Sequence, residues 1–110
     1  YQLDNLVIFV DKNNFQQTGA CRDILGTDSL SEKFKSFNCF SQEIDGHNHS
    51  QIYNAICKNL NSPRPNLIVA NTTKGKGISL FENKNEWHHS VLTKKIYEEA
   101  ITDLKKNYDY

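Results

Sequence analysis

The chain has 110 residues, and its thirteen Lys and Arg residues balance its thirteen Asp and Glu residues. A chain of this length holds at most one domain with a modest core. Balanced charge gives no electrostatic reason to expect nucleic acid or an anionic membrane as a partner. The longest apolar run is Leu6 to Val10, so we expect no membrane span and no signal peptide. The three cysteines form no CxxC pair, which favours free thiols and a cytoplasmic location.

The first predicted element is a strand over Leu6 to Val10. A short, continuous apolar run of this kind is typical of a strand buried on both faces of a parallel sheet. A polar stretch, Asp11 to Asn14, follows directly. Ligands of open α/β sheets bind at the carboxyl ends of strands, and oxygens from Asn side chains and the backbone suit a hard cation such as Mg²⁺. The alternative is a polar turn, because Asn and Asp are common turn formers.

A turn-like stretch over Gln16 to Leu25 precedes the first predicted helix. Ser29 and Glu32 have the spacing of a capping box, in which each side chain bonds the other residue's backbone amide. The apolar spacing after Ser29 predicts a short helix from Leu30 to Phe37. Its two phenylalanines, Phe34 and Phe37, are expected in the core.

Two further strands and a helix follow with short connections. The strands are predicted over Cys39 to Ile44 and over Leu67 to Ala70. Asn48, with Gln51 three residues later, predicts the start of a helix that continues to Leu60 before two prolines end it. Alternating strands and helices indicate an α/β domain with three layers and a mainly parallel sheet.

The last third begins with a long loop, Thr72 to Glu86. Irregular segments of this length in compact domains are usually functional or disordered. Its KGKG sequence lacks the spacing of a phosphate-binding P-loop. The final predicted helix, Leu92 to Leu104, places Tyr97, Ile101 and Leu104 on one face.

Taken in order, several segments resemble the transketolase family, in particular its separately encoded N-terminal subunits. They are LDNLVIFVDKNNFQQTG (Leu3 to Gly19), DGHNHSQI (Asp45 to Ile52), NTTKGKGISLFENKNEWHH (Asn71 to His89) and the closing amphipathic segment. The third is the most specific, because KGKG, EN and an acidic residue before Trp-His occur together. The resemblance covers about Leu3 to Leu104.

The resemblance implies a thiamine-diphosphate-binding fold and transfer of a two-carbon ketol unit between sugar-like or sugar-phosphate substrates. Residues 1–110 would be the second half of the domain that binds the diphosphate. We expect the upstream half to lie outside this chain, because the sequence has no Met and starts almost directly on a strand. The expected partner is the subunit or domain that holds the aminopyrimidine, in a dimer or heterotetramer.

The resemblance also assigns roles to three residues. The Asn13 side chain and the Phe15 carbonyl would ligate the Mg²⁺, or Ca²⁺, that neutralises the cofactor's diphosphate. A third protein ligand, an Asp in a Gly-Asp-Gly triplet, lies upstream in the family. His88 would contact the diphosphate and act catalytically on the sugar's oxygens, a task that suits imidazole.

Two departures from the family pattern keep alternatives open. Gly is usual at the position of His89, and a left-handed backbone there would disfavour His. Lys74 stands where relatives have another contact residue, and we assign it no role. The alternatives are a non-catalytic homologue that serves as an interaction module, or an enzyme like deoxyxylulose-phosphate synthase. A zinc site at His47, His49, His88 and His89 lacks the usual spacing and a cysteine pair.

Overall fold

The computed structural model describes residues 3–26, 28–60 and 62–107. The chain divides into two compact units, each considered by itself below. The first unit comprises Tyr1–Asn13 and Gly26–Thr72, and the second comprises Asn14–Leu25 and Thr73–Tyr110. The first contains β1 (Val7–Lys12), α2 (Leu30–Ser36), β4 (Phe40–Asp45), α3 (His49–Cys57) and β5 (Asn66–Asn71). The second contains β2 (Phe15–Gln16), β3 (Gly19–Ala20), α1 (Cys21–Ile24), η1 (Asn85–His88) and α4 (Lys94–Asn107).

The first unit is built on a three-stranded parallel sheet with the order β1-β5-β4. The central strand β5 carries the apolar run LIVA, and Leu67, Ile68 and Val69 are fully buried. Alternate residues of a strand point to opposite faces of the sheet. A continuous apolar strand is therefore suited to the middle position, where both faces are covered.

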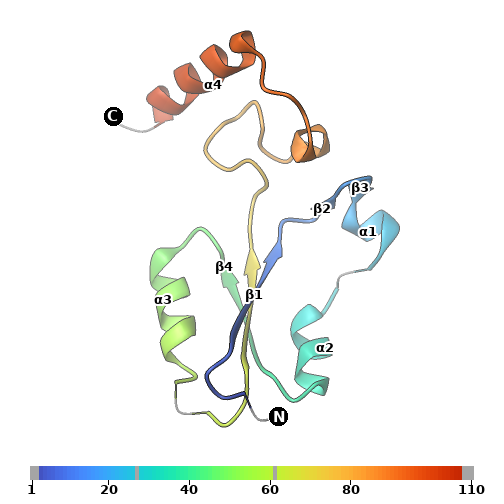
Figure 1. Cartoon of the computed structure of the whole chain (residues 1–110), viewed down its shortest axis with the longest axis vertical. Helices are drawn as coiled ribbons and strands as arrows, with labels where there is room; N and C mark the ends of the chain where they lie inside the picture. Colours follow the sequence, from blue (N-terminus) through green and yellow to red (C-terminus); the bar gives the residue numbers. More distant parts are fainter. Residues whose placement is uncertain (1–2, 27, 61, 108–110) are drawn as a thin grey trace. The chain divides into compact units, whose positions relative to one another are not determined.

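The two faces of β5 pack into separate clusters. On one face, Ile68 and Ala70 pack with Ile44 and with residues of α3. On the other, Leu67 and Val69 pack with Cys39 and with residues of α2. The helices α2 and α3 therefore cover opposite faces of the sheet (Figure 1). This arrangement confirms the predicted three-layer α/β fold.

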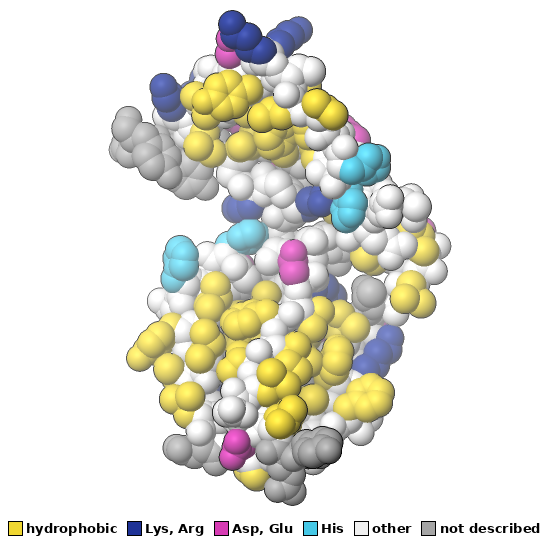
Figure 2. All heavy atoms as spheres, in the orientation of Figure 1, with side chains coloured by type: hydrophobic (Ala, Val, Ile, Leu, Met, Phe, Trp, Pro, Cys, Tyr) yellow, Lys and Arg dark blue, Asp and Glu magenta, His cyan; other side chains and the backbone are white. Residues whose placement is uncertain are grey.

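The strand β1 is less buried than its sequence predicts. Ile8 and Val10 pack into the cluster beneath α2, whereas Val7 and Phe9 remain 40% and 48% exposed. The prediction that this run is buried on both faces is wrong within the described residues, because β1 pairs only with β5 at one side of the sheet. Figure 2 shows hydrophobic side chains gathered on the face of this unit that is turned to the viewer.

The helix α2 begins where the sequence predicts but not with the predicted cap. Ser29 has a left-handed backbone (φ 55°) and its side chain makes no capping hydrogen bond. The Glu32 carboxylate accepts a hydrogen bond from Lys35 Nζ at 2.6 Å, so it does not complete a capping box. Phe34 packs against the core, but Phe37 follows the last helical residue and is 75% exposed. The expectation of a buried Phe37 is therefore wrong.

The helix α3 confirms the second capping prediction. The Asn48 side chain accepts a hydrogen bond from the Gln51 backbone amide at 3.0 Å. The helix ends at Cys57, three residues before the predicted end, and Leu60 is exposed. The buried Asn59 side chain donates to the Arg64 carbonyl at 2.9 Å, which holds the turn that follows the helix.

In the second unit a short hairpin replaces much of the predicted turn. The strands β2 and β3 pair antiparallel, with Phe15 opposite Ala20. The Cys21 amide donates to the Asn14 carbonyl at 2.9 Å, which closes the hairpin at the start of α1. The unit also contains the long loop after Thr72, the single turn η1 and the C-terminal helix α4.

The helix α4 contains Tyr97, Ile101 and Leu104 at helical spacing, as predicted. Its buried residue is Ala100, whereas Tyr97 is 52% exposed. A small side chain such as that of Ala100 allows the helix backbone to lie close to the segment packed against it. Asp103 of the same helix accepts a hydrogen bond from the Ser79 amide at 2.6 Å, which ties α4 to the loop.

No helix among the described residues has both the length and the apolar character needed to cross a membrane. The three cysteines are unpaired, as predicted.

Candidate functional site

Asn13 lies directly after β1, at the carboxyl edge of the sheet. The parallel register places Lys12, Asn71 and Asp45 in one row at this edge. Asn13 directly follows β1 and Thr72 directly follows β5. Because the last residues of these strands pair with one another, Asn13 and Thr72 both lie at this edge. The backbone amide of Thr72 donates to the Lys12 carbonyl at 3.3 Å. The sheet topology thus delivers Asn13 to the edge where open α/β sheets bind ligands.

The Asp11 carboxylate connects Asn13 with the end of β5. Asn13 Nδ2 donates to Asp11 Oδ2 at 3.1 Å, and Thr72 Oγ1 donates to Asp11 Oδ1. Sequence reasoning gave neither Asp11 nor Thr72 a role, because the two residues are brought together only by the pairing of β1 with β5.

Asn14 separates Asn13 from Phe15 and takes a left-handed conformation, with φ of 67°. Asn tolerates this backbone better than most residues other than Gly. The predicted polar turn is therefore present, and it does not exclude a ligand-binding role for its neighbours. Phe15 begins β2 and is half-buried.

His88 is the last residue of η1 in the second unit. The Trp87 ring anchors this turn on Phe81, with the ring centroids 4.2 Å apart. Asn85 Nδ2 donates to the Gln17 carbonyl at 3.4 Å, and η1 packs against β2. The structure thereby brings the segment of His88 to the segment of Phe15 within one unit. His88 itself is exposed.

Lys74 is the residue that sequence reasoning missed near His88. Its Nζ lies 3.5 Å from His88 Nδ1. A lysine ammonium only donates hydrogen bonds, so Nδ1 must accept in this contact. In the neutral imidazole the proton then resides on Nε2. Lys74 therefore favours the His88 tautomer in which Nε2 carries the proton and can donate a hydrogen bond to a third group.

His89, which stands where the family usually has Gly, causes no backbone conflict. Its φ is −150°, which lies outside the left-handed region that favours Gly. The doubt raised by a possible left-handed backbone at this position is thereby removed. Its ring lies 6.4 Å from the ring of His88, edge to face, and both side chains are exposed.

The glycines of KGKG shape the loop that leads to η1. Gly75 has a φ of +72°, and a Cβ added there would lie 2.6 Å from the Phe81 carbonyl oxygen. Gly77 has a φ of 99°, and its amide donates to Glu82 Oε1 at 2.9 Å. The close approach at Gly75 is therefore made to the protein's own backbone, next to the Phe81 that supports Trp87.

Replacing Gly75 with Ala should lower the free energy of unfolding by about 2 to 4 kcal/mol. The positive φ alone disfavours an L-residue by about 1–2 kcal/mol, and an overpacked Cβ adds a cost of similar size. Chemical denaturation of the two proteins measures the difference. Gly26→Ala is the matched control, because its Cβ would meet nothing within 4 Å. Equal losses for the two variants would contradict the described loop.

The donor chemistry at Asn13 and Phe15 fits a hard cation. An amide oxygen and a backbone carbonyl are ligands that Mg²⁺ and Ca²⁺ accept, together with water and phosphate oxygens. No group of three or more His, Cys, Asp or Glu side chains in the described ranges is placed to hold a metal ion. A site made from an amide and a carbonyl contains none of these residue types, and the diphosphate itself would supply the negative charge.

Two polar atoms of η1 lack a hydrogen-bond partner among the described residues. They are Asn85 Oδ1 and Trp87 Nε1, and both atoms are buried. Buried polar groups in proteins are nearly always paired. The turn that carries His88 therefore contains one buried acceptor and one buried donor that the described residues leave unpaired.

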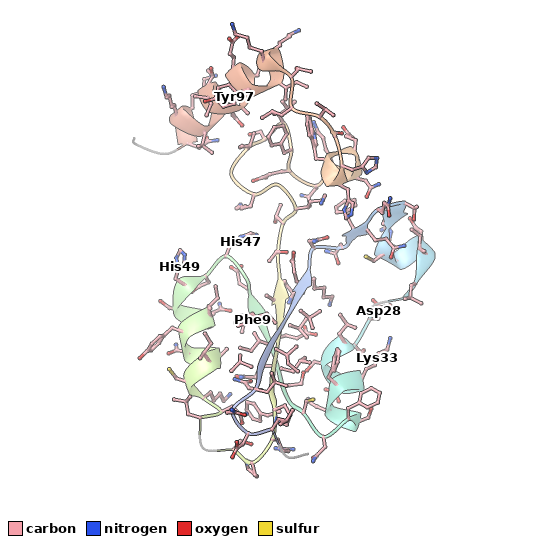
Figure 3. The ribbon with its side chains drawn as sticks, in the orientation of Figure 1. Phe9, Asp28, Lys33, His47, His49 and Tyr97 are labelled. Atoms are coloured by element: carbon pink, nitrogen blue, oxygen red, sulfur yellow. The ribbon has the colours of Figure 1, made fainter. Side chains whose placement is uncertain are left out.

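His47 and His49 lie at the start of α3, away from one another in the view of Figure 3. The Asp45 carboxylate accepts a hydrogen bond from the His47 amide at 2.9 Å, which stabilises the turn between β4 and α3. Gly46 permits the close approach of β4 to β5, because a Cβ there would lie 2.5 Å from Thr72 Cγ2. This geometry supports a structural role for the Asp-Gly-His sequence.

Comparison with known proteins gives one consistent result. Residues 1–110 match the family model described as the transketolase, thiamine diphosphate binding domain. The chain is 39% identical over 105 residues to one of the subunits of apulose-4-phosphate transketolase from Actinobacillus succinogenes. It is 35% identical over 106 residues to the 6-deoxy-6-sulfo-D-fructose transketolase subunit SqwG of a Clostridium species. Both alignments cover 96% of this chain and 38% of the relative.

Single-chain relatives and solved structures agree with these matches. Human transketolase is 30% identical over 106 residues, which cover 94% of this chain and 16% of the relative. The crystal structure of transketolase from Campylobacter jejuni superposes with a TM-score of 0.83 at 25% identity, covering 94% of this chain and 16% of that one. The chain thus spans well under half the length of the relatives described here.

Proposed function

The chain belongs to the transketolase family, and we propose that it forms the later part of the thiamine-diphosphate-binding domain of a transketolase. The complete enzyme would transfer a two-carbon ketol unit between sugar-like substrates with the aid of thiamine diphosphate and Mg²⁺. The observation that carries this proposal is the family match over residues 1–110, which includes Asn13, Phe15 and His88. The packing of η1 against β2, which joins the segments of His88 and Phe15, supports it.

In this proposal Asn13 and Phe15 hold the divalent ion through the amide oxygen and the backbone carbonyl. The bound cofactor supplies the carbanion-stabilising chemistry, which no side chain provides. The role of the strand end is to fix the ion, and with it the diphosphate, at the carboxyl edge of the sheet. Asn14, in its left-handed turn, sets the path of the backbone between the two ligands.

In this proposal His88 acts on the substrate. With Nδ1 accepting from Lys74, Nε2 donates to an oxygen of the diphosphate or the sugar. A donor held at this point stabilises negative charge that develops on a substrate oxygen and can transfer a proton to it. The packing of Trp87 on Phe81 anchors the turn that carries His88.

The active enzyme is an assembly of which this chain is one part. Two relatives that align over nearly the whole chain are named as subunits of transketolases. We therefore infer that a partner subunit or domain binds the aminopyrimidine of the cofactor, in a cytoplasmic dimer or heterotetramer. Activity is a property of that complete assembly.

A coupled assay on the full-length protein with its partner subunit tests this function. The complex is incubated with a panel of ketose and ketose-phosphate donors and aldose acceptors. We expect ketol transfer that requires both thiamine diphosphate and Mg²⁺. A folded complex that binds neither cofactor nor ion would instead identify a non-catalytic interaction module.

A further inference from the structure

The two oxygens of the Asp11 carboxylate accept hydrogen bonds from two different residues. Oδ2 accepts from Asn13 Nδ2 at 3.1 Å, and Oδ1 accepts from the Thr72 hydroxyl. Asp11 sits in β1 opposite Ala70 of β5, two residues before Thr72. The carboxylate is thus attached to the end of the central strand while it holds the Asn13 side chain, and all three residues lie in the first unit.

The contact with Asp11 favours one orientation of the Asn13 amide. An Asn amide has a donor end and an acceptor end of nearly equal shape, and rotation by half a turn exchanges them. An ionised carboxylate accepts hydrogen bonds but cannot donate them. Asp11 therefore selects the orientation in which the NH₂ group of Asn13 faces the carboxylate and Oδ1 lies on the other side of the amide.

We propose that Asp11 is a positioning residue for a divalent cation: it fixes the Asn13 amide so that Oδ1 is presented to the ion, and Thr72 holds Asp11 in place. This inference rests on the proposed function, in which Asn13 ligates that ion. Groups that orient a metal ligand through hydrogen bonds commonly determine metal affinity without touching the metal. The Asp11 negative charge also favours a cation nearby.

The substitution Asp11→Asn tests the orientation directly. An Asn at position 11 can donate from its own NH₂ to Asn13 Oδ1, which would stabilise the opposite orientation of the ligand amide. In the full-length, partnered protein, we expect Mg²⁺ affinity at saturating thiamine diphosphate to fall by about 10- to 100-fold. Isothermal titration calorimetry with Mg²⁺ measures this affinity without any reaction. Thr72→Val, which removes only the support of Asp11, should give a smaller loss.

Asp45→Asn is the matched control for the lost charge. Asp45 ends β4 in the same row of the sheet as Lys12 and Asn71. Its Oδ1 accepts from the His47 amide rather than from a side chain near Asn13. Mg²⁺ affinity should remain at the wild-type value in this variant. An equal loss for Asp45→Asn and Asp11→Asn would overturn the proposal in favour of a general electrostatic effect.

A double-mutant cycle separates positioning from charge. If Asp11 acts through Asn13, Asp11→Asn should cause no further loss of Mg²⁺ affinity in an Asn13→Ala background. An undiminished loss in that background would overturn the proposal. The free energy of unfolding of the cofactor-free protein should be unchanged by Asp11→Asn, and a large drop would assign Asp11 to the fold instead.

The outcomes also distinguish this inference from the proposed function. A wild-type complex without Mg²⁺-dependent cofactor binding would overturn both. Normal binding by the wild type, a loss in Asn13→Ala and wild-type affinity in Asp11→Asn would overturn the positioning role alone.

Discussion

Replacing His88 with Ala should lower the turnover number of the assembled enzyme by about 100- to 10,000-fold, the usual contribution of a positioned acid–base group. The turn η1, which carries His88, packs against β2, and the contact of Lys74 with Nδ1 leaves Nε2 as the donor. Because this donor acts on charge that develops during the reaction, its loss should affect the chemical step more than binding.

The affinity for thiamine diphosphate should fall much less in the His88→Ala variant. In the proposed site the divalent ion neutralises most of the diphosphate's charge, so the imidazole contributes a minor part of cofactor binding. Steady-state kinetics combined with cofactor titrations separate the two effects. A large loss of cofactor affinity with an unchanged turnover number would contradict the assigned role.

The adjacent histidine provides a matched control. His89 is exposed like His88 and lies on the same turn, but its φ of −150° requires no glycine. Both His89→Ala and His89→Gly should therefore keep near-normal turnover. If His89→Ala abolishes turnover while His88→Ala retains it, the catalytic assignment belongs to His89.

Replacing Asn13 with Ala should weaken Mg²⁺ and thiamine diphosphate binding together. One ligand oxygen would be lost from an ion that bridges protein and diphosphate, so the two affinities are coupled. We expect a loss of at least about 10- to 100-fold for each, because even residues that only orient a metal ligand have effects of that size. Activity should return in part at high concentrations of cofactor and Mg²⁺.

The neighbouring Asn14 offers the control for this variant. Its left-handed backbone, with φ of 67°, is one that Gly adopts without strain. Asn14→Gly should therefore preserve both affinities, which calorimetric titration can measure beside Asn13→Ala. Unchanged affinities in Asn13→Ala would contradict the assignment of Asn13 as a ligand.

The layered fold could be predicted because apolar runs and helix periodicity are local properties of the sequence. Which strand occupies the centre could not, since β1 and β5 have equally apolar runs. Their different burial follows from pairing, with β5 between two neighbours and β1 beside one. The two predicted caps differ for a local reason: the Asn48 side chain accepts from the Gln51 amide, whereas the Glu32 carboxylate accepts from the Lys35 side chain instead of a backbone amide.

The candidate site shows a similar division between local and long-range information. Asn13, Phe15 and His88 were assigned from motifs that are continuous in sequence. Asp11 with Thr72, and Lys74 with His88, emerged only from contacts between separate segments. An Asp near the end of a strand and a Lys in a glycine-containing loop carry no local signal that would reveal such partners.

If this chain contributes Asn13 to a Mg²⁺-dependent thiamine diphosphate site, cofactor binding must depend on both the ion and this residue. Calorimetric titration of the full-length, partnered protein with thiamine diphosphate, with and without Mg²⁺, measures both dependences. We expect saturable binding that needs Mg²⁺ in the wild type and is strongly weakened in Asn13→Ala. Equal binding with Mg²⁺ and with a chelator, or no binding by the folded complex, would contradict it.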